Sequence, residues 1–216
     1  ILRETHESDL LQGQHTEVQY TFSYFDGFGR EIQKKIQAKP IEPGGPQLDK
    51  CWIGSGWTIF NNKGKPVKKY EPFFDIDHLF KYEKTEGVSP TIFYDPVGRV
   101  IGNIYPNNTF EKTLYSNWFQ TSWDSNDTIS ESDPRDDDIL GDHFRRLFPD
   151  PDDYESWFDA RINGQMDTTG NPLEEQQAAQ KAILHDNSPS ISYLDSLGRE
   201  FVIVVDNKDA GKYSTH

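Results

Sequence analysis

A short motif recurs along this chain and constrains its fold more than any other feature. It consists of an aspartate, a glycine three residues later and an arginine directly after that glycine, with an aromatic residue just ahead, at residues 26–30, 95–99 and 195–199. Aspartate first and glycine fourth are typical of a type I turn, because the carboxylate can accept hydrogen bonds from nearby backbone N–H groups and glycine tolerates a positive φ. Strand-like runs flank the copies, so each is predicted to be a β-hairpin tip.

Two weaker copies extend the series. One, "IFNNKGKPV", has Asn, Gly and Lys in the three places, and the other, "SWDSNDTIS", keeps the aromatic and the first Asp but has Asp in place of the glycine. The five tips begin at positions 26, 61, 95, 124 and 195, a spacing of about 30–35 residues with a last gap about two repeats long. The residues predicted to build them are Tyr24, Asp26, Gly29, Arg30, Asn61, Gly64, Lys65, Tyr94, Asp95, Gly98, Arg99, Trp123, Asp124, Tyr193, Asp195, Gly198 and Arg199.

A recurring period of this size indicates a repeat architecture, in which each unit buries its faces only against its neighbours. Here the unit is a hairpin. The aromatic residue before each tip would stack along the array, and the Arg or Lys after it could bond a carboxylate or carbonyl of a neighbouring unit. The alternative is an ordinary antiparallel sheet that reuses common turn residues, but turn chemistry alone does not explain the aromatic residue and the arginine.

The motif Tyr-Asp-x-x-Gly-Arg resembles the RHS/YD repeat. Four longer runs, "FSYFDGFGREIQKK", "GWTIFNNKGKPVKKYEPFF", "GVSPTIFYDPVGRVI" and "SWDSNDTI", resemble the RHS-repeat region of the B component of the insecticidal toxin complexes, the Tc toxins. The similarity runs from about residue 16 to residue 207, nearly the whole chain.

This resemblance implies a structural function. In Tc toxins the RHS repeats of the B and C components build a hollow β-shell that holds a toxic polypeptide unfolded before delivery through the A-component channel. The partners implied are therefore the C component, the A-component channel and the enclosed polypeptide. The resemblance also implies synthesis in the cytoplasm followed by secretion as part of an extracellular complex. Self-cleavage in this family belongs to the C component, so no catalytic residue is carried over and no enzyme activity is expected.

Composition fits such a wall. Of the 216 residues 34% are hydrophobic and 13% aromatic, and the mean hydropathy is −0.80. A sheet that is wet on one or both faces needs fewer apolar residues than a closed core. We expect a mainly β fold in which repeated antiparallel β-hairpins form an open curved sheet, part of a hollow β-shell.

Residues 133–186 interrupt the hairpin rhythm and are predicted to form a helical insertion packed on one face of the sheet. Three helices are expected: the first within 133–148, a second with Asp150 as cap and Gly164 as stop, and a third with Asn171 as cap and Pro172 at its first position. The predicted organisation is hairpin repeats over 1–132, the acidic insertion over 133–186 and a further, truncated hairpin over 187–216. Together they are expected to form one structural unit, a fragment of a larger protein.

Charge and motifs exclude several other functions. The net charge is −14, and residues 124–159 carry thirteen acidic side chains against three arginines, which disfavours nucleic-acid binding. The aspartates at 133 and 136–138 lack the spacing of a calcium loop, the six histidines lack zinc spacing, and no cofactor fingerprint is present. The single Cys51 excludes an internal disulfide and fits folding in a reducing compartment. No membrane-spanning run is visible.

A second function stays open at this point. An RHS-type domain at a cell surface could bind carbohydrate or protein through exposed aromatic side chains, for which Trp52, Trp57 and Trp118 are the candidates.

Overall fold

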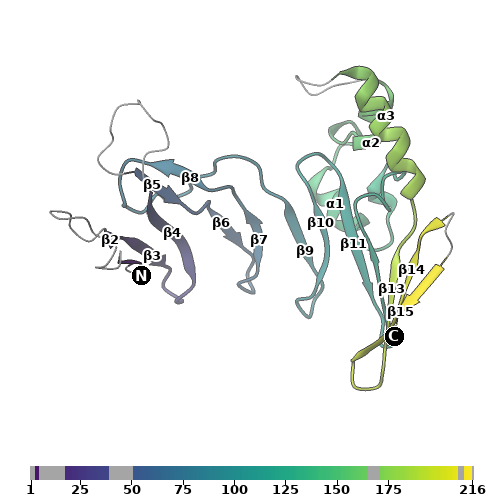
Figure 1. Cartoon of the computed structure of the whole chain (residues 1–216), viewed down its shortest axis with the longest axis horizontal. Coiled ribbons are helices and arrows are strands. Elements are labelled where there is room, and N and C mark those ends of the chain that lie inside the picture. Colours follow the sequence, from purple (N-terminus) through teal and green to yellow (C-terminus); the bar gives the residue numbers. More distant parts are fainter. Residues whose placement is uncertain (1–2, 5–17, 39–50, 165–170, 209–211, 216) are drawn as a thin grey trace. The chain divides into compact units, whose positions relative to one another are not determined.

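The computed structural model describes residues 3–4, 18–38, 51–164, 171–208 and 212–215 (Figure 1). The fold is mainly antiparallel β-sheet with a small helical insertion, as predicted. The chain forms two compact units, residues 1–89 and residues 90–216. A division after Ser89 could not be predicted from the sequence. The predicted segments 1–132, 133–186 and 187–216 were separated by composition and motif, whereas the two units are separated by the compactness of the fold.

The described residues of the first unit contain three groups of strands. Its four-stranded sheet has the order β3-β4-β5-β8, and two further pairs, β1 with β2 and β6 with β7, are antiparallel hairpins or ladders. The strands are β1 (Arg3–Glu4), β2 (Val18–Gln19), β3 (Thr21–Phe25), β4 (Glu31–Ala38), β5 (Cys51–Gly54), β6 (Thr58–Phe60), β7 (Pro66–Lys69) and β8 (Phe73–Asp75).

A buried lysine organises one face of the four-stranded sheet. Lys35 on β4 is fully buried, and its ammonium group forms an ion pair with Asp75 and donates to the carbonyl of Asp77 at 3.0 Å. The side-chain amide of Gln33 bonds both backbone groups of Lys81, at 3.1 and 2.8 Å. Because buried polar groups are costly without partners, these bonds fix the segment that follows β8 over this face.

The second unit is built on a single antiparallel sheet. Among its described residues, seven strands follow the order β15-β14-β13-β12-β11-β10-β9, so every strand lies beside its neighbour in sequence. The strands are β9 (Thr91–Tyr94), β10 (Val100–Ile104), β11 (Phe110–Tyr115), β12 (Phe119–Trp123), β13 (Ser190–Leu194), β14 (Glu200–Asp206) and β15 (Lys212–Thr215).

The helical insertion lies between β12 and β13, which nevertheless pair directly, with Ser122 opposite Ser190. Figure 1 shows the insertion at one end of the strands and the β9–β10 and β13–β14 turns at the other. Its elements are η2 (Pro134–Asp136), α1 (Gly141–Leu147), η3 (Pro151–Asp153), α2 (Trp157–Ile162), α3 (Pro172–Ala182) and η4 (Ile183–His185).

The predicted third helix is confirmed in its caps, and the first two are shorter than predicted. The Asn171 side chain accepts from the N–H of Leu173, and Pro172 begins α3. The first helix begins only at Gly141, because the carboxylate of Asp137 accepts two backbone N–H groups, of residues 139 and 140, just ahead of it. Asp150, the predicted cap of the second helix, caps only the 3₁₀ turn η3. The helix α2 begins later and is capped by Ser156.

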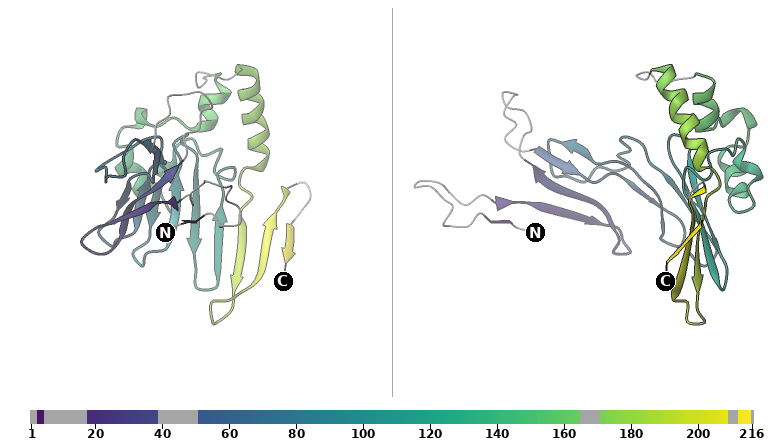
Figure 2. Two further views of the ribbon diagram at one scale, coloured as in Figure 1. Left: turned by 60° about the vertical axis from the view of Figure 1, so that its left-hand side comes forward. Right: turned by 45° about the vertical axis from the view of Figure 1, so that its right-hand side comes forward.

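The insertion packs on one face of the sheet through a small aromatic core. Phe110 on β11 and Phe144 on α1 are buried with ring centres 5.1 Å apart, and Ile104 and Leu140 complete the cluster. A Cβ atom on Gly102 would lie 2.5 Å from the Leu140 side chain, so glycine is needed for this close approach. The views in Figure 2 show the helices gathered on one side of the β9–β14 strands. Among the described residues, no helix has both the length and the apolar character of a membrane span.

Candidate functional site at the hairpin tips

Four of the predicted tips share one backbone geometry. In each, the N–H of the glycine donates to the carbonyl of the first residue at 2.9–3.1 Å, and the N–H of the first residue donates to the carbonyl of the fifth at 2.8–3.0 Å. The glycines have φ values between 74° and 90°, which is the left-handed region that closes a type I turn with a bulge. The four tips begin at Asp26, Asn61, Asp95 and Asp195.

The first side chain of each tip holds the turn together. At Asp95 the Oδ1 atom accepts from the N–H of Val97 at 3.0 Å and from that of Arg99 at 2.9 Å. Asp26 and Asp195 accept the same pair of bonds at 2.8–2.9 Å. The Asn61 side chain does so at 2.9–3.0 Å, which explains how asparagine substitutes for aspartate.

The arginine that ends each tip pairs with the aspartate of its own tip. The Nε atoms of Arg30, Arg99 and Arg199 lie 2.6, 2.7 and 2.8 Å from the second carboxylate oxygen. The sequence prediction that this arginine bonds a neighbouring unit's carboxylate or carbonyl is therefore wrong for its Nε group. A carboxylate four residues earlier is already placed by the turn, so the ion pair forms locally.

These bonds lower the pKa values of the tip carboxyl groups. The backbone N–H of Arg30 is the main cause at Asp26, with the guanidinium adding to it, and the same order holds at Asp195. At Asp95 partial burial acts to raise the pKa, but the bonds from Arg99 outweigh it and the pKa is lowered. The folded turns at these three aspartates therefore favour the ionised form of the carboxyl group over the protonated form.

The fifth predicted tip, at Trp123 and Asp124, is not a hairpin tip. Asp124 directly follows β12, and its carboxylate accepts from the N–H groups of Asn126 at 2.7 Å and Asp127 at 3.0 Å, closing a local turn that leads into the insertion. Without a glycine in the fourth place, the chain has no residue suited to positive φ that would turn it back into a strand. The returning strand comes only at Ser190, after the helices.

Successive hairpins are joined by arginine lying over an aromatic ring. The guanidinium carbon of Arg30 lies 4.7 Å from the ring centre of Phe60, directly ahead of the next tip in the chain. In the second unit that of Arg99 lies 4.3 Å from the ring centre of Tyr115, directly ahead of the β11–β12 turn. At these two tips the arginine therefore has two roles, an ion pair within its turn and a cation–π contact to the next hairpin.

The sequence did not identify Phe60 and Tyr115 as partners of the arginines. The signal that could have found Tyr115 is register, because continuing the β10–β11 pairing places it opposite Arg99. The sequence also missed the tip at the other end of these strands, where Tyr105 and Thr109 exchange a backbone bond and Asn108 has φ 63°. Asparagine tolerates this conformation, so no glycine marks the turn.

The three tryptophans proposed as exposed binding residues differ in exposure. Trp52 is only 5% exposed, so its expected exposure is wrong; it packs against Phe22 and His78. Trp57 is half-buried, against Phe80 and Tyr82. Trp118, in the β11–β12 turn, is 59% exposed.

No three His, Cys, Asp or Glu side chains among the described residues are placed to hold a metal ion. Several acidic side chains of the insertion instead cap turns and helices, as at Asp133, whose carboxylate accepts from the N–H of Arg135 and pairs with its guanidinium.

The hairpin fold is found in solved structures of Tc toxins. The chain aligns over 99% of its length with a crystal structure of TcdB2–TccC3 at a TM-score of 0.59 and 20% identity. It aligns with a Tc holotoxin pore of Photorhabdus luminescens over 99% of its length, at 0.59 and 19%. A TcdB2–TccC3 structure without the hypervariable C-terminal region matches over 94%, at 0.55 and 20%.

The chain spans 8–9% of the length of these neighbours. At such identity the likeness establishes the fold. The sequence matches no protein-family model and no curated protein.

Proposed function

We propose that this chain is a segment of the β-sheet wall in the B component of a Tc-type toxin complex, where the wall encloses a toxic polypeptide before delivery. The observation that carries the proposal is the alignment of 99% of the chain with TcdB2–TccC3 at a TM-score of 0.59, although the chain spans only 9% of that neighbour. A short chain that aligns over almost its whole length with a small part of a much longer one is what a segment of a long repetitive wall would give.

The bonding pattern supports a structural role. In the second unit each strand pairs with its neighbour in the chain, so the sheet can extend at its edges by adding further hairpins. The tips carry their own ion pairs, and the contacts of Arg30 with Phe60 and of Arg99 with Tyr115 fix one hairpin to the next. Such an array is held by many equivalent local bonds and needs no single central core.

In this proposal the chain has no catalytic residue and takes no cofactor. Its partners are the C component, which completes the shell, the A-component channel and the enclosed unfolded polypeptide. The complex acts outside the cell that makes it, after synthesis in the cytoplasm.

The test is protection of the enclosed polypeptide. The B-type polypeptide that carries this chain is assembled with a C-type partner whose enclosed segment bears an epitope tag, and the complex is treated with protease. We expect the tag to survive in the intact complex and to be digested after denaturation. Digestion of the tag in the intact complex at the denatured rate would contradict the proposal.

Two variants link protection to the hairpin tips. The double variant Asp95→Ala with Arg99→Ala removes one tip's ion pair and its contact with Tyr115, and is expected to speed digestion of the tag. Asp138→Ala, at an exposed aspartate of the insertion, is the matched control and should leave protection unchanged.

A further inference from the structure

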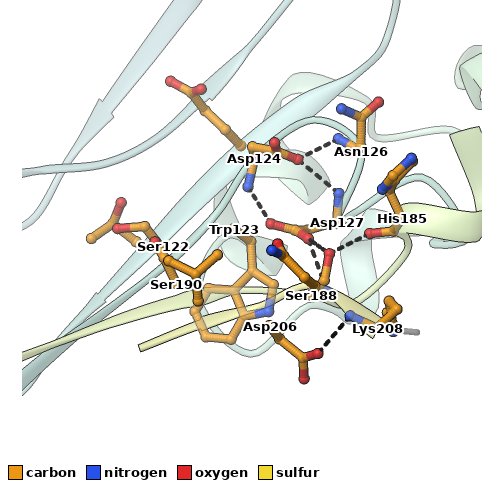
Figure 3. Close-up of a pocket in the computed structure, with 14 residues that line it drawn as sticks. Ser122, Trp123, Asp124, Asn126, Asp127, His185, Ser188, Ser190, Asp206 and Lys208 are labelled. Atoms are coloured by element: carbon orange, nitrogen blue, oxygen red, sulfur yellow. Dashed lines mark hydrogen bonds between the residues drawn. The ribbon is translucent and has the colours of Figure 1, made fainter. Parts of the chain in front are cut away.

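A groove opens in the second unit where the helical insertion leaves the sheet and returns to it. It has a volume of about 710 Å³, within the range of small-molecule sites. Trp123 and Asp124 reach it from the end of β12, Ser188 from the chain that returns to β13, and Asp206 from the end of β14 (Figure 3). Asn207, directly after β14, lines it as well.

A hydrogen-bond network makes one wall of this groove rigid. The Asp127 carboxylate accepts from the N–H of Asp124 at 2.8 Å and from the N–H of Ser188 at 2.9 Å. The Ser188 hydroxyl lies 2.8 Å from that carboxylate and 2.7 Å from the carbonyl oxygen of His185. The two ends of the insertion are thereby tied together, so the wall is formed before any ligand arrives.

The rest of the lining is mostly polar, with the indole of Trp123 and the side chain of Val205 as its apolar parts. Trp123 and Asp206 line the groove together with this network (Figure 3). The Trp123 ring is half-buried, and the ammonium group of Lys112 lies 5.4 Å from its centre, which helps to hold it. Asp124 and Asn207 are exposed at the rim, so a carboxylate acceptor and an amide, which both donates and accepts, face the same space.

The chemistry of the lining selects among ligand classes. Four carboxylates, of Glu111, Asp124, Asp127 and Asp206, against the single amine of Lys208 disfavour phosphates and other anions. Among the described residues no metal-binding group is formed. A wholly apolar ligand would remove the exposed polar groups of Asp124 and Asn207 from water without offering hydrogen bonds in exchange.

We propose that this groove is a binding site for a neutral saccharide. The sugar ring packs against the indole of Trp123, and its hydroxyls donate to Asp124 and exchange hydrogen bonds with Asn207. A polyol offers donors and acceptors on its edge and C–H groups on its face, which matches a lining of carboxylate, amide, hydroxyl and one aromatic ring. This site does not depend on the proposed wall role, and either can be right without the other.

Saturation-transfer NMR on the full chain tests this proposal, with glucose, galactose and N-acetylglucosamine as probes and spermidine as a competing cation. At least one sugar is expected to receive saturation and to bind with a dissociation constant on the order of 1 mM, as expected for a small open site. Binding of spermidine without binding of any sugar would overturn the proposal in favour of an amine site. Absence of transfer to all three sugars would overturn it as well.

Variants then locate the bound sugar. Asp124→Asn and Asn207→Ala should each weaken sugar binding at least fivefold while leaving the thermal unfolding temperature near that of the parent chain. Asp138→Asn, an exposed aspartate that does not line the groove, is the matched control and should bind as the parent does. Equal binding by all three variants would show that the sugar lies elsewhere and would refute this site.

Discussion

The guanidinium of Arg99 lies over the ring of Tyr115, 4.3 Å from its centre, while its Nε atom holds Asp95 at 2.7 Å. One side chain thus closes its own hairpin turn and contacts the hairpin that follows. The same arrangement joins Arg30 to Phe60 in the first unit. At these two tips it gives the Asp-x-x-Gly-Arg motif a physical reason to recur, since each of the two arginines connects neighbouring hairpins.

A double-mutant cycle on Arg99 and Tyr115 measures this contact. We expect Arg99→Ala and Tyr115→Ala each to lower the free energy of unfolding. The loss in the double variant should be smaller than the sum of the two single losses, and the difference, the coupling energy, should be about 0.5–1 kcal/mol. Urea unfolding of the four proteins gives the coupling. A value indistinguishable from zero would show that the two side chains are neighbours without interacting.

Arg199→Ala is the matched control for this cycle. Arg199 makes the same ion pair with Asp195, but it is 73% exposed, and no ring contact involves it among the described residues. Its replacement should therefore cost less than that of Arg99.

Gly98 has a φ of 90°, a conformation that a β-branched side chain resists. Gly98→Val is expected to lower the free energy of unfolding by about 1–3 kcal/mol. Gly27→Ala is the control, because Gly27 does not have a positive φ and a Cβ atom there meets nothing within 4 Å. If Gly98→Val melts at the parent temperature, the turn at Asp95 is not the one described.

Phe144 connects the insertion to the sheet, since it is fully buried against Phe110 and Tyr154. Phe144→Ala should cost about 3–5 kcal/mol, because it leaves a cavity in the core of the second unit. Leu147→Ala removes a side chain of the same helix that is 38% exposed, and it should cost much less. Equal losses in urea unfolding would mean that the insertion does not pack on the sheet through Phe144.

His143 makes the stability of the second unit depend on pH. Burial against the sheet, where its ring lies 4.7 Å from that of Phe93, lowers its pKa, and the nearby Arg146 adds to this, while Asp142 acts the other way. The folded state therefore binds the proton less readily than the unfolded chain does. We therefore expect the stability to be highest above the ordinary histidine pKa of about 6.5 and to decline as the pH falls below it.

We expect the unfolding temperature to drop between pH 7.5 and pH 5.5, and the drop to be smaller in His143→Phe, which keeps the ring contact with Phe93. An equal drop in both proteins would assign the effect to other groups. The tip carboxyl groups, whose pKa values are lowered, contribute a separate loss only in stronger acid, below about pH 4.

The sequence predicted those parts of the fold whose cause is local. A type I turn depends only on the aspartate or asparagine, the glycine and the backbone between them. Four tips could therefore be identified from the four or five residues that form each of them. The cap at Asn171 could be predicted for the same reason, because the bond it makes reaches only to Leu173.

Long-range relationships could not be predicted in this way. That Trp52 is buried depends on the segment around His78, which crosses the sheet and is fixed by the Lys35–Asp75 pair 40 positions apart. The turn at Asp124 has two of the motif's residues, the aromatic one and the aspartate. It does not form a hairpin tip, because the glycine is missing and the partner strand begins only at Ser190. The groove beside Trp123 exists only because the two ends of the insertion meet.

The central claim, that the hairpins form an open wall, is tested most directly by small-angle X-ray scattering of the isolated chain. A compact domain of 216 residues has a radius of gyration of about 17 Å. We predict a clearly larger value for a sample whose circular dichroism is strand-rich and whose unfolding is cooperative. A folded sample at about 17 Å would show a closed globule and would contradict the proposed wall.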